Sequence, residues 1–359
     1  MENIKILNMQ LEGVPIFKNK ININFYHDDL DQNNPKTKPV VLFTGLVATG
    51  KSSVLKIMKF ILEIIINGKG LNENQVSLIS SSDNFSYSVV FYYKNKYHKI
   101  SSEIEKVCNK NKKTKLIYKN EYLRSIEKEK IKSKEDLEKF INTRLNKNNS
   151  KVIRDSLDEN IGVFLKDDDS IVALITKDTT LPIKQITNNN DIDFLEAIDH
   201  IDTSLLELLD SSIDYIKKEN DNIILKFKGD DRVYLSKNER FLKNLLSSKT
   251  IKSLKITLNS IEILRFGGYL FIDDIENHMN KYLIDELVDL FTNPSVNKNN
   301  AAIFLSSNYP ENININEFYV LNKISKDKSI ISLVSKDKYM ENYNNAEKLK
   351  QYIGNKIHN

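Results

Sequence analysis

The sequence is poor in the residues that define several classes of protein. Its 359 residues include one cysteine, Cys108, and no tryptophan. A single thiol excludes an intramolecular disulfide framework and any zinc site that needs several cysteines. Cys108 lies in a lysine-rich stretch, so we expect an incidental thiol at the surface or at a strand edge. The many lysines, asparagines and isoleucines, together with the absence of tryptophan, indicate a nucleotide-composition bias of the source.

Long apolar runs are also missing. The longest, residues 60–66, contains Glu63 and is far shorter than the roughly 20 residues that a membrane-spanning helix needs. The first residues show no basic stretch followed by an apolar one, so we expect no secretory signal. These absences predict a soluble, cytoplasmic protein that has no membrane partner.

Charge of neither sign dominates the whole chain. Lysines and arginines number 53 against 49 aspartates and glutamates, whereas a nucleic-acid binder driven by overall charge is usually more lopsided. Locally, residues 94–154 carry a net charge of +11 and residues 155–231 a net charge of −12. The basic block keeps nucleic acid or an acidic protein as a candidate partner. Two solvated faces that balance each other are the favoured interpretation.

The composition does contain enough apolar material for a large core, at 40% of residues, which excludes a wholly disordered chain. Residues 1–70 resemble an α/β unit. Strand patterns occupy residues 3–11, 21–26 and 40–44, and the last of these is apolar throughout, as in a strand buried on both faces. From Lys51 the apolar residues recur every three or four positions, which predicts a helix that ends at Gly68 and Gly70.

Residues 71–240 hold no recognisable catalytic motif and are expected to form an inserted α+β region. Strand patterns lie at residues 87–93 and 115–118, and a capping box predicts a helix that starts at Ser133. A second helix is expected after Asp202 or Thr203 from an amphipathic stripe of five residues, Leu205, Leu206, Leu209, Ile213 and Ile216.

Residues 241–335 return to an α/β pattern and are expected to complete the core that residues 1–70 begin. We expect helices at 250–264 and 281–291, and apolar strands at 269–272 and 301–305. Strands that alternate with helices predict a parallel sheet. A hairpin of residues 318–321 and 329–334 and a helical tail over 336–359 follow.

The strongest motif is the run Gly45-Leu46-Val47-Ala48-Thr49-Gly50-Lys51-Ser52, which fits the phosphate-binding loop G-x-x-x-x-G-K-[ST]. The glycines let successive N–H groups cradle a phosphate at the positive end of the following helix. Lys51 would neutralise the β- and γ-phosphates, and the Ser52 hydroxyl would bind Mg²⁺. The run lies between a buried strand and an amphipathic helix, which is the context that this motif requires.

A second motif supplies the acids. Residues 269–272 are apolar and lead directly into Asp273 and Asp274, the Walker B pattern. We expect Asp273 to bind Mg²⁺ beside the phosphate loop and Asp274 to polarise the attacking water.

The segment Phe271-Ile272-Asp273-Asp274-Ile275-Glu276-Asn277 resembles the "IDEIEN" segment of the ABC-like, AAA-type ATPases related to SMC and RecF heads. Leu246-Ser247-Ser248-Lys249-Thr250 is similar to their "SSGT" signature, and Leu305-Ser306-Ser307-Asn308 stands where they carry "TTH". The nearest of these families are the single-chain ATPases that accompany effectors in bacterial phage-defence and abortive-infection operons.

The resemblance implies a P-loop NTPase fold, an ABC/SMC-like head with a mixed or parallel sheet flanked by helices. It implies that two copies bind ATP and Mg²⁺ face to face, as a homodimer or within a higher oligomer. The assembly would then regulate a separate effector, a nuclease or a toxin. The expected nucleotide contacts are Gly45, Leu46, Val47, Ala48, Thr49, Gly50, Lys51, Ser52 and Ser53, joined by Ser247, Ser248, Lys249 and Thr250 of the other copy. The expected metal ligands are Ser52 and Asp273, and the expected catalytic residues are Lys51, Asp274 and Asn308.

The chain departs from the family at three of these positions. Asp274 replaces the catalytic glutamate, Lys249 replaces the signature glycine, and Asn308 replaces the switch histidine. The shorter acid would hold water less well, and Asn308 hydrogen-bonds without taking a positive charge. These changes predict slow hydrolysis. Gln75 is a metal-contact candidate by position only, and His278 is expected to be a polar helix residue without a clear role.

Three other functions stay open at this stage. A non-hydrolytic scaffold locked by ATP fits the same departures, and a RecF-type repair ATPase would place the basic block on DNA. A transporter subunit is the least favoured, because the segment between Lys51 and Asp273 is long and the signature lacks paired glycines. No segment has the cysteine and histidine spacing of an HNH-type nuclease site, so we expect any cutting activity to lie in another protein.

Overall fold

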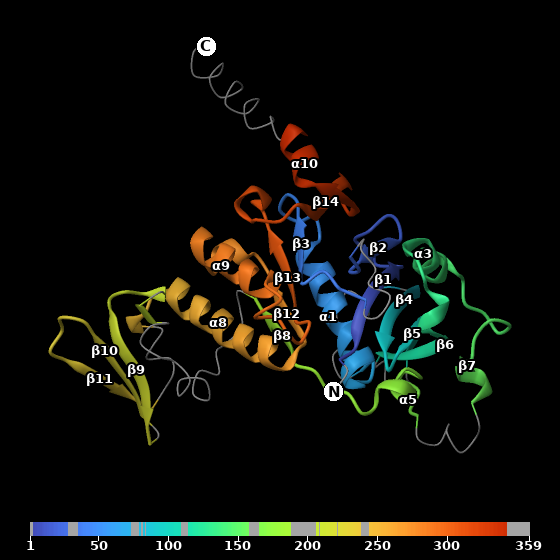
Figure 1. Cartoon of the computed structure of the whole chain (residues 1–359), viewed down its shortest axis with the longest axis horizontal. Coiled ribbons are helices and arrows are strands. Elements are labelled where there is room, and N and C mark those ends of the chain that lie inside the picture. The colour runs from blue at the N-terminus through green and yellow to red at the C-terminus, as the bar shows by residue number, and fades with distance from the viewer. Residues whose placement is uncertain are drawn as a thin grey trace, which may run out of the picture.

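The structure is a computed structural model (Figure 1). It describes residues 3–27, 35–72, 79, 82, 84–108, 114–157, 165–187, 206–207, 209–220, 222–237 and 244–342. No helix of this described part is both long enough and apolar enough to cross a membrane.

A six-stranded sheet in the order β15-β14-β3-β13-β12-β8 forms the centre of the molecule. The strands from β14 to β8 run parallel, and β15 pairs antiparallel with β14. The bounds are β3 (Val40–Thr44), β8 (Ile183–Ile186), β12 (Tyr269–Ile272), β13 (Ala302–Ser307), β14 (Glu317–Ser325) and β15 (Lys328–Ser335). The strands and the hairpin that the sequence predicts in this region are therefore present, as is the parallel pairing.

Helices cover both faces of this sheet, which explains why β3, β12 and β13 are buried along their whole length (Figure 1). Val41, Phe43 and Phe304 face α1 (Lys51–Asn67). Their neighbours along the strands face α8 (Ser248–Phe266) and α9 (Lys281–Thr292). The predicted helices at 250–264 and 281–291 are thus correct to within two residues at each end.

A second six-stranded sheet, in the order β2-β1-β4-β5-β6-β7, is antiparallel throughout. Its strands are β1 (Lys5–Glu12), β2 (Ile21–Asn24), β4 (Asn84–Tyr93), β5 (Lys96–Cys108), β6 (Thr114–Glu127) and β7 (Val152–Ile153). Helix α3 (Lys134–Asn142) covers its outer face, and the Ser133 side chain caps that helix, as predicted, by accepting a hydrogen bond from Asp136 N at 3.2 Å.

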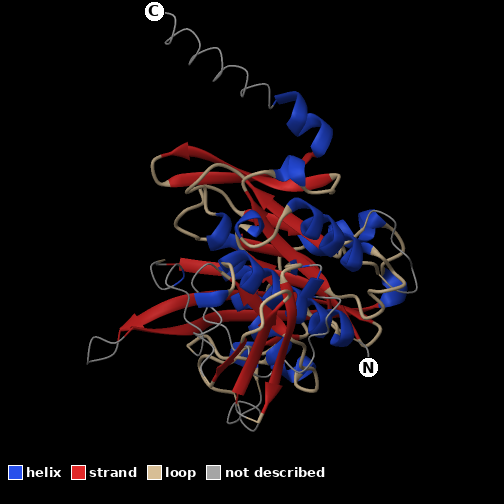
Figure 2. Cartoon of the chain, turned by 90° about the vertical axis from the view of Figure 1, so that its left-hand side faces the viewer, coloured by secondary structure: helices blue, strands red, loops and turns tan. Residues whose placement is uncertain are grey.

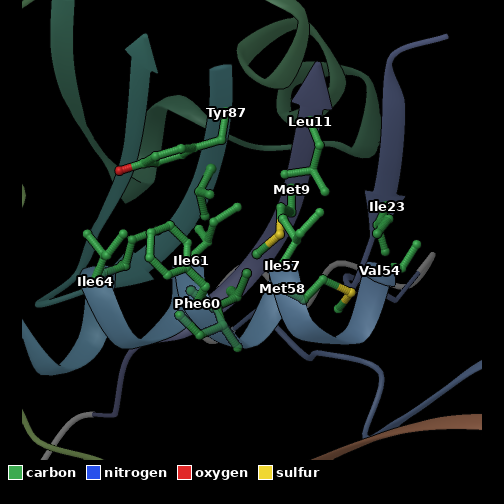
Figure 3. Close-up of a cluster of buried hydrophobic side chains, with 14 of the residues drawn as sticks. Met9, Leu11, Ile23, Val54, Ile57, Met58, Phe60, Ile61, Ile64 and Tyr87 are labelled. Carbon is green, nitrogen blue, oxygen red and sulfur yellow. The ribbon is translucent and has the colours of Figure 1, made fainter. Parts of the chain in front are cut away.

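Helix α1 lies between the two large sheets and is apolar on almost every side. Ile57, Met58 and Ile61 reach Met9 and Tyr87 of the antiparallel sheet, while other residues of the helix belong to the core of the parallel sheet (Figure 3). A helix that is hydrophobic all round is expected to be buried all round. The first residue of α1, Lys51, is therefore fixed on a helix that has little freedom to move.

A third sheet, β11-β10-β9, protrudes on the side of α8 (Figure 1). It consists of β9 (Ile213–Glu219), β10 (Asn222–Phe227) and β11 (Val233–Ser236). The predicted helix is present at Leu206 and Leu209 but does not continue through Ile213 and Ile216, because these two residues lie in β9. Strand β9 has a register shift opposite Lys226 and Phe227 of β10. The shift turns Ile213 and Ile216 toward the same core although they are three residues apart, a spacing that is otherwise typical of a helix. Leu205 lies outside the described residues.

Two strand pairings cross the expected boundaries between residues 1–70, 71–240 and 241–335. Strand β8, from the expected insertion, forms the edge of the parallel sheet, and β1 pairs with β4 across the first expected boundary. Strand β5, which ends at Cys108, was not predicted from the sequence.

The described part of the chain closes with α10 (Lys336–Asn342), which projects beyond the β14–β15 hairpin (Figures 1 and 2). Short helical turns complete the fold: α5 (Ala173–Thr176), η1 (Lys128–Lys130), η2 (Arg154–Ser156), η4 (Ile275–Asn277) and η5 (Pro310–Asn312).

Candidate functional site

The carboxyl ends of β3, β13 and β12 meet at one edge of the parallel sheet. Thr44 of β3 is paired with Ser307 of β13, and Leu305 of β13 is paired with Ile272 of β12. The residues that follow these strands are Gly45, Asn308 and Asp273, which are far apart in the sequence. Parallel pairing therefore brings three of the predicted site residues to the same edge.

The loop after β3 turns back sharply at its two glycines. Gly45 has φ of +148°, and a Cβ there would lie 2.3 Å from the carbonyl oxygen of Leu321. Gly50 has φ of +104° and directly precedes α1. The Thr49 hydroxyl donates to Leu46 O at 2.8 Å and tightens the turn. Only glycine fits at position 45 without moving the backbone of β14.

Lys51 is buried, and its ammonium group points back into this loop. Its Nζ donates to Gly45 O at 2.7 Å and to Leu46 O at 3.2 Å. A third hydrogen bond, of 2.8 Å, goes to Asn308 Oδ1. Helix α1 starts with no side-chain cap and no acidic residue in its first turn, and Ser52 and Ser53 are half-buried there. The backbone N–H groups of the first turn, the positive end of the helix dipole and the Lys51 ammonium group therefore lie together at the start of α1. This arrangement favours the binding of an anion.

The two acids after β12 are held by Ser306 of the neighbouring strand. The Ser306 hydroxyl donates to Asp273 Oδ1 at 2.6 Å and accepts from Asp274 N at 2.7 Å. Asp274 adopts φ of +51°, a left-handed conformation that aspartate tolerates better than most residues. Its carboxylate accepts no hydrogen bond from any described residue. Asp274 is therefore placed by its backbone and keeps its side chain available.

Glu276 is a third acid at the site, and no role was predicted for it from the sequence. Its Oε1 accepts hydrogen bonds from Asn308 N at 2.9 Å and from Asn308 Nδ2 at 2.8 Å. Its Oε2 is buried and has no partner among the described residues. Ser306 was missed as well. Both residues lie within motifs that the sequence displays, but their partners follow from strand pairing and not from spacing.

The charges at the site shift the pKa values of their neighbours. Burial lowers the pKa of the Lys51 ammonium, and Asp274, Glu276 and Asp273 oppose that shift. Burial also raises the pKa of Asp274, the charges of Asp273 and Glu276 add to the rise, and Lys51 counteracts it. Three carboxylates around one ammonium leave the site rich in negative charge, which a metal cation would relieve.

His278 was expected to be a polar helix residue, but it lies in the turn after η4 and is fully buried. It donates from Nε2 to Asp273 O at 2.8 Å, because a carbonyl oxygen only accepts. Burial lowers the pKa of its imidazole and so favours the neutral ring, whose proton then sits on Nε2. Its own carbonyl accepts from Ser253 Oγ at 2.8 Å, so His278 links the end of β12 to α8.

The predicted signature residues do not join this site within one chain. Ser247 caps α8 by accepting from Thr250 N at 3.0 Å, and Thr250 Oγ1 donates to Asp210 Oδ2 at 3.1 Å. Ser248 and Lys249 are exposed in the first turn of α8. That helix covers the face of the sheet opposite α1, so these residues and Lys51 approach the sheet from different sides (Figure 1).

The remaining loop residues are open to solvent. Ala48 is exposed, and Leu46 and Val47 are 82% and 81% exposed, which is unusual for large apolar side chains. Gln75 lies outside the described residues, and Cys108 is the last residue of β5.

The donor set suits magnesium better than zinc. Among the described residues there is no group of three or more histidine, cysteine or acidic side chains arranged to hold a metal. A magnesium site does not need such a group, because Mg²⁺ is usually bound by one or two protein oxygens together with substrate phosphates. The Ser52 hydroxyl and the Asp273 carboxylate, whose Oδ1 is already fixed by Ser306, fit that chemistry.

No protein-family model matches the chain, and no curated protein matches it. Among solved structures, the chain is similar to the SMC head domain from Thermotoga maritima, at 13% sequence identity and a TM-score of 0.41. The match covers 92% of this chain and 99% of that one. A TM-score below 0.5 adds no weight to the site, which stands on its own geometry.

Proposed function

We propose that this chain is a P-loop ATPase of the ABC-like kind that binds ATP with Mg²⁺ and hydrolyses it slowly. One observation carries the proposal. Lys51 in the glycine loop lies within hydrogen-bonding distance of Asn308, and Asp274 and Asp273 are close enough to shift its pKa. A lysine for the phosphates, an acid for the metal and an amide or acid to orient the attacking water are parts that recur in P-loop enzymes that transfer a phosphoryl group to water.

Each residue has a distinct task in this proposal. Lys51 would leave the carbonyls of Gly45 and Leu46 for the β- and γ-phosphates, and the N–H groups at the start of α1 would cradle the β-phosphate. Ser52 and Asp273 would hold a magnesium ion, which neutralises charge on the phosphate oxygens. The free carboxylate of Asp274 would accept a hydrogen bond from the attacking water.

Slow hydrolysis follows from two of these groups. Asp274 is one methylene shorter than glutamate, so it reaches less far toward a water held at the γ-phosphate. Asn308 is neutral, so it adds no positive charge when negative charge develops. The same features favour the alternative of an ATP-locked scaffold. Such a scaffold would bind ATP tightly, but its turnover would be no higher than that of Lys51→Ala.

The direct test compares Lys51→Ala with Lys56→Ala, which removes an exposed lysine from the same helix. Loss of a charge-assisted contact predicts ATP affinity weaker by about 10- to 100-fold for Lys51→Ala. Lys56→Ala should bind like the wild type. Titration with a fluorescent ATP analogue gives the affinities, and phosphate release gives the turnover. Equal affinity of the wild type and Lys51→Ala would refute the proposal.

We further propose that two copies associate around ATP, with Ser247, Ser248, Lys249 and Thr250 of one chain facing the nucleotide of the other. The exposure of Ser247, Ser248 and Lys249 supports this arrangement, as does that of Leu46 and Val47, whereas Thr250 is buried behind them. Light scattering should detect a dimer with ATP and a monomer without it. Lys249→Glu should weaken the dimer and leave monomer affinity for ATP unchanged, whereas Lys326→Glu, in the β14–β15 turn, should change neither the dimer nor the affinity for ATP.

A DNA-associated role of the RecF type would show as duplex binding that weakens steeply with salt. Regulation of a separate effector and a part in anti-phage defence rest on the family resemblance alone. Adjacent genes and co-expression would test them.

A further inference from the structure

Three side chains form a continuous hydrogen-bonded chain across the site. Lys51 Nζ donates to Asn308 Oδ1 at 2.8 Å, and Asn308 Nδ2 donates to Glu276 Oε1 at 2.8 Å. The backbone N–H of Asn308 donates to the same Glu276 oxygen at 2.9 Å. Glu276 therefore holds both the side chain and the backbone of the residue that follows β13.

The chemistry of the two outer groups fixes the orientation of the amide between them. An ammonium group only donates hydrogen bonds, and a carboxylate only accepts them. Asn308 must then turn its oxygen toward Lys51 and its nitrogen toward Glu276. Rotating the amide by 180° would place donor against donor on one side and acceptor against acceptor on the other.

A carboxylate at position 276 has an electrostatic cost. It adds a negative charge beside those of Asp273 and Asp274, and its second oxygen is buried without a partner among the described residues. A buried acceptor oxygen that has lost its water and gained no donor destabilises the folded protein. A group retained at such a cost at a site is a candidate for function.

We infer that Glu276 is a positioning residue, which clamps Asn308 so that its amide oxygen faces the nucleotide. This inference rests on the proposed ATPase function. When Lys51 turns to the phosphates, Asn308 Oδ1 loses its partner and offers an acceptor to the water beside the γ-phosphate. In this role Asn308 accepts a hydrogen bond from the water and does not donate one to the phosphate. It shares the task of orienting that water with Asp274.

The inference predicts a separation of binding from turnover. In Glu276→Ala the amide is free to rotate, so turnover at saturating ATP should fall about tenfold while ATP affinity stays within about twofold. In Glu276→Gln the amide oxygen still accepts from Asn308, so turnover should fall by no more than about threefold. Glu286→Ala, which removes an exposed acid from α9, is the control for a general effect of lost charge.

A paired exchange tests the orientation itself. Asn308→Asp alone places two carboxylates in contact and should lower turnover by at least about tenfold. The double variant Asn308→Asp/Glu276→Gln keeps the total charge, restores a donor opposite position 308 and still presents an oxygen to the nucleotide. Its turnover should return to within about fivefold of wild type.

The outcomes separate the two proposals. If wild type does not bind ATP, the proposed function itself fails, and the inference falls with it. If wild type binds and hydrolyses ATP but Glu276→Ala turns over at the wild-type rate, only the inference is refuted. The inference also fails if the double variant is as slow as Asn308→Asp, because that result means that Asn308 donates to the phosphate. If wild type binds ATP without hydrolysing it, the inferred role of Glu276 in turnover is refuted, while the proposal that the chain binds ATP stands.

Discussion

Two groups of carboxylates in this chain have opposite surroundings. Glu121, in the antiparallel sheet, has a side chain that is 0% exposed, and both of its oxygens are fully engaged. Ser102 and Ser170 donate to Oε1 at 3.0 Å and 2.8 Å, while Ile171 N and Arg154 donate to Oε2 at 3.0 Å and 2.9 Å. At the edge of the parallel sheet, no residue in the described part of the chain donates to the Asp274 carboxylate, and one oxygen of Glu276 has no partner there.

The difference indicates what each group is for. A buried acid whose oxygens are both satisfied ties together the strand and the loops that supply its donors. Acids that are close together and only partly satisfied lower stability, and such local costs are expected at functional sites. The Glu121 network is therefore structural, and the Lys51 site retains hydrogen-bonding capacity for a ligand.

The largest expected effect is on stability, from Glu121→Ala. The change leaves Arg154, two serines and a backbone N–H without their acceptor, so the free energy of unfolding should fall by about 3–5 kcal/mol. Urea denaturation measures it. Glu103→Ala, on the neighbouring strand, removes an exposed acceptor of Asn120 and should cost less than about 1 kcal/mol. Similar losses from the two variants would end the distinction between the two groups of acids.

Asp274→Asn should have the reverse profile. Asparagine has the same shape and tolerates the left-handed backbone at this position, and the change removes repulsion from Asp273 and Glu276. Stability should stay level or rise, and ATP affinity should be kept. Turnover should fall by about 100-fold, which corresponds to about 2.7 kcal/mol in activation free energy. Asp289→Asn, exposed on α9, is the matched control. Unchanged turnover in Asp274→Asn would remove Asp274 from the catalytic residues.

The sequence predicts those parts of the site whose signals are local. The loop before Lys51 lies between an apolar strand and a periodic helix, and Asp273 directly follows another apolar strand, so each was found from its own neighbours. The contacts of Ser306 and Glu276 were not, because they depend on the pairing of β13 with β12. Nothing in the spacing of either residue reveals its partner.

The fold was missed where a local pattern is ambiguous. Ile213 and Ile216 have the spacing of a helix, yet a register shift in β9 turns both to the same core. Strand β8 is four residues long and half-buried at its first three positions, so its pattern is too short to identify it. Its place at the sheet edge is set by pairing with β12.

The smallest expected effect is a difference in pH dependence between wild type and Glu121→Gln. Burial is the main cause that raises the pKa of Glu121 above its ordinary value of 4.5, while Arg154 and the other donors pull it down. A carboxyl group whose pKa is higher in the folded state binds protons more tightly there than in the unfolded chain. Its contribution to stability therefore falls as pH rises from 4.5 toward the raised value.

Glu121→Gln has no proton to lose, so it should gain stability relative to wild type as pH rises through that window. The gain cannot exceed about 1.4 kcal/mol per pH unit, the limit for one proton. Urea midpoints of both proteins between about pH 4.5 and pH 7 measure it, and the difference cancels the titration of the other acids. A constant difference across this range would mean that the four donors fully offset the cost of burying the charge. In that case Glu121 would carry its charge in the core with no loss of stability. The acids near Lys51, which lack such donors, would then differ from it even more clearly.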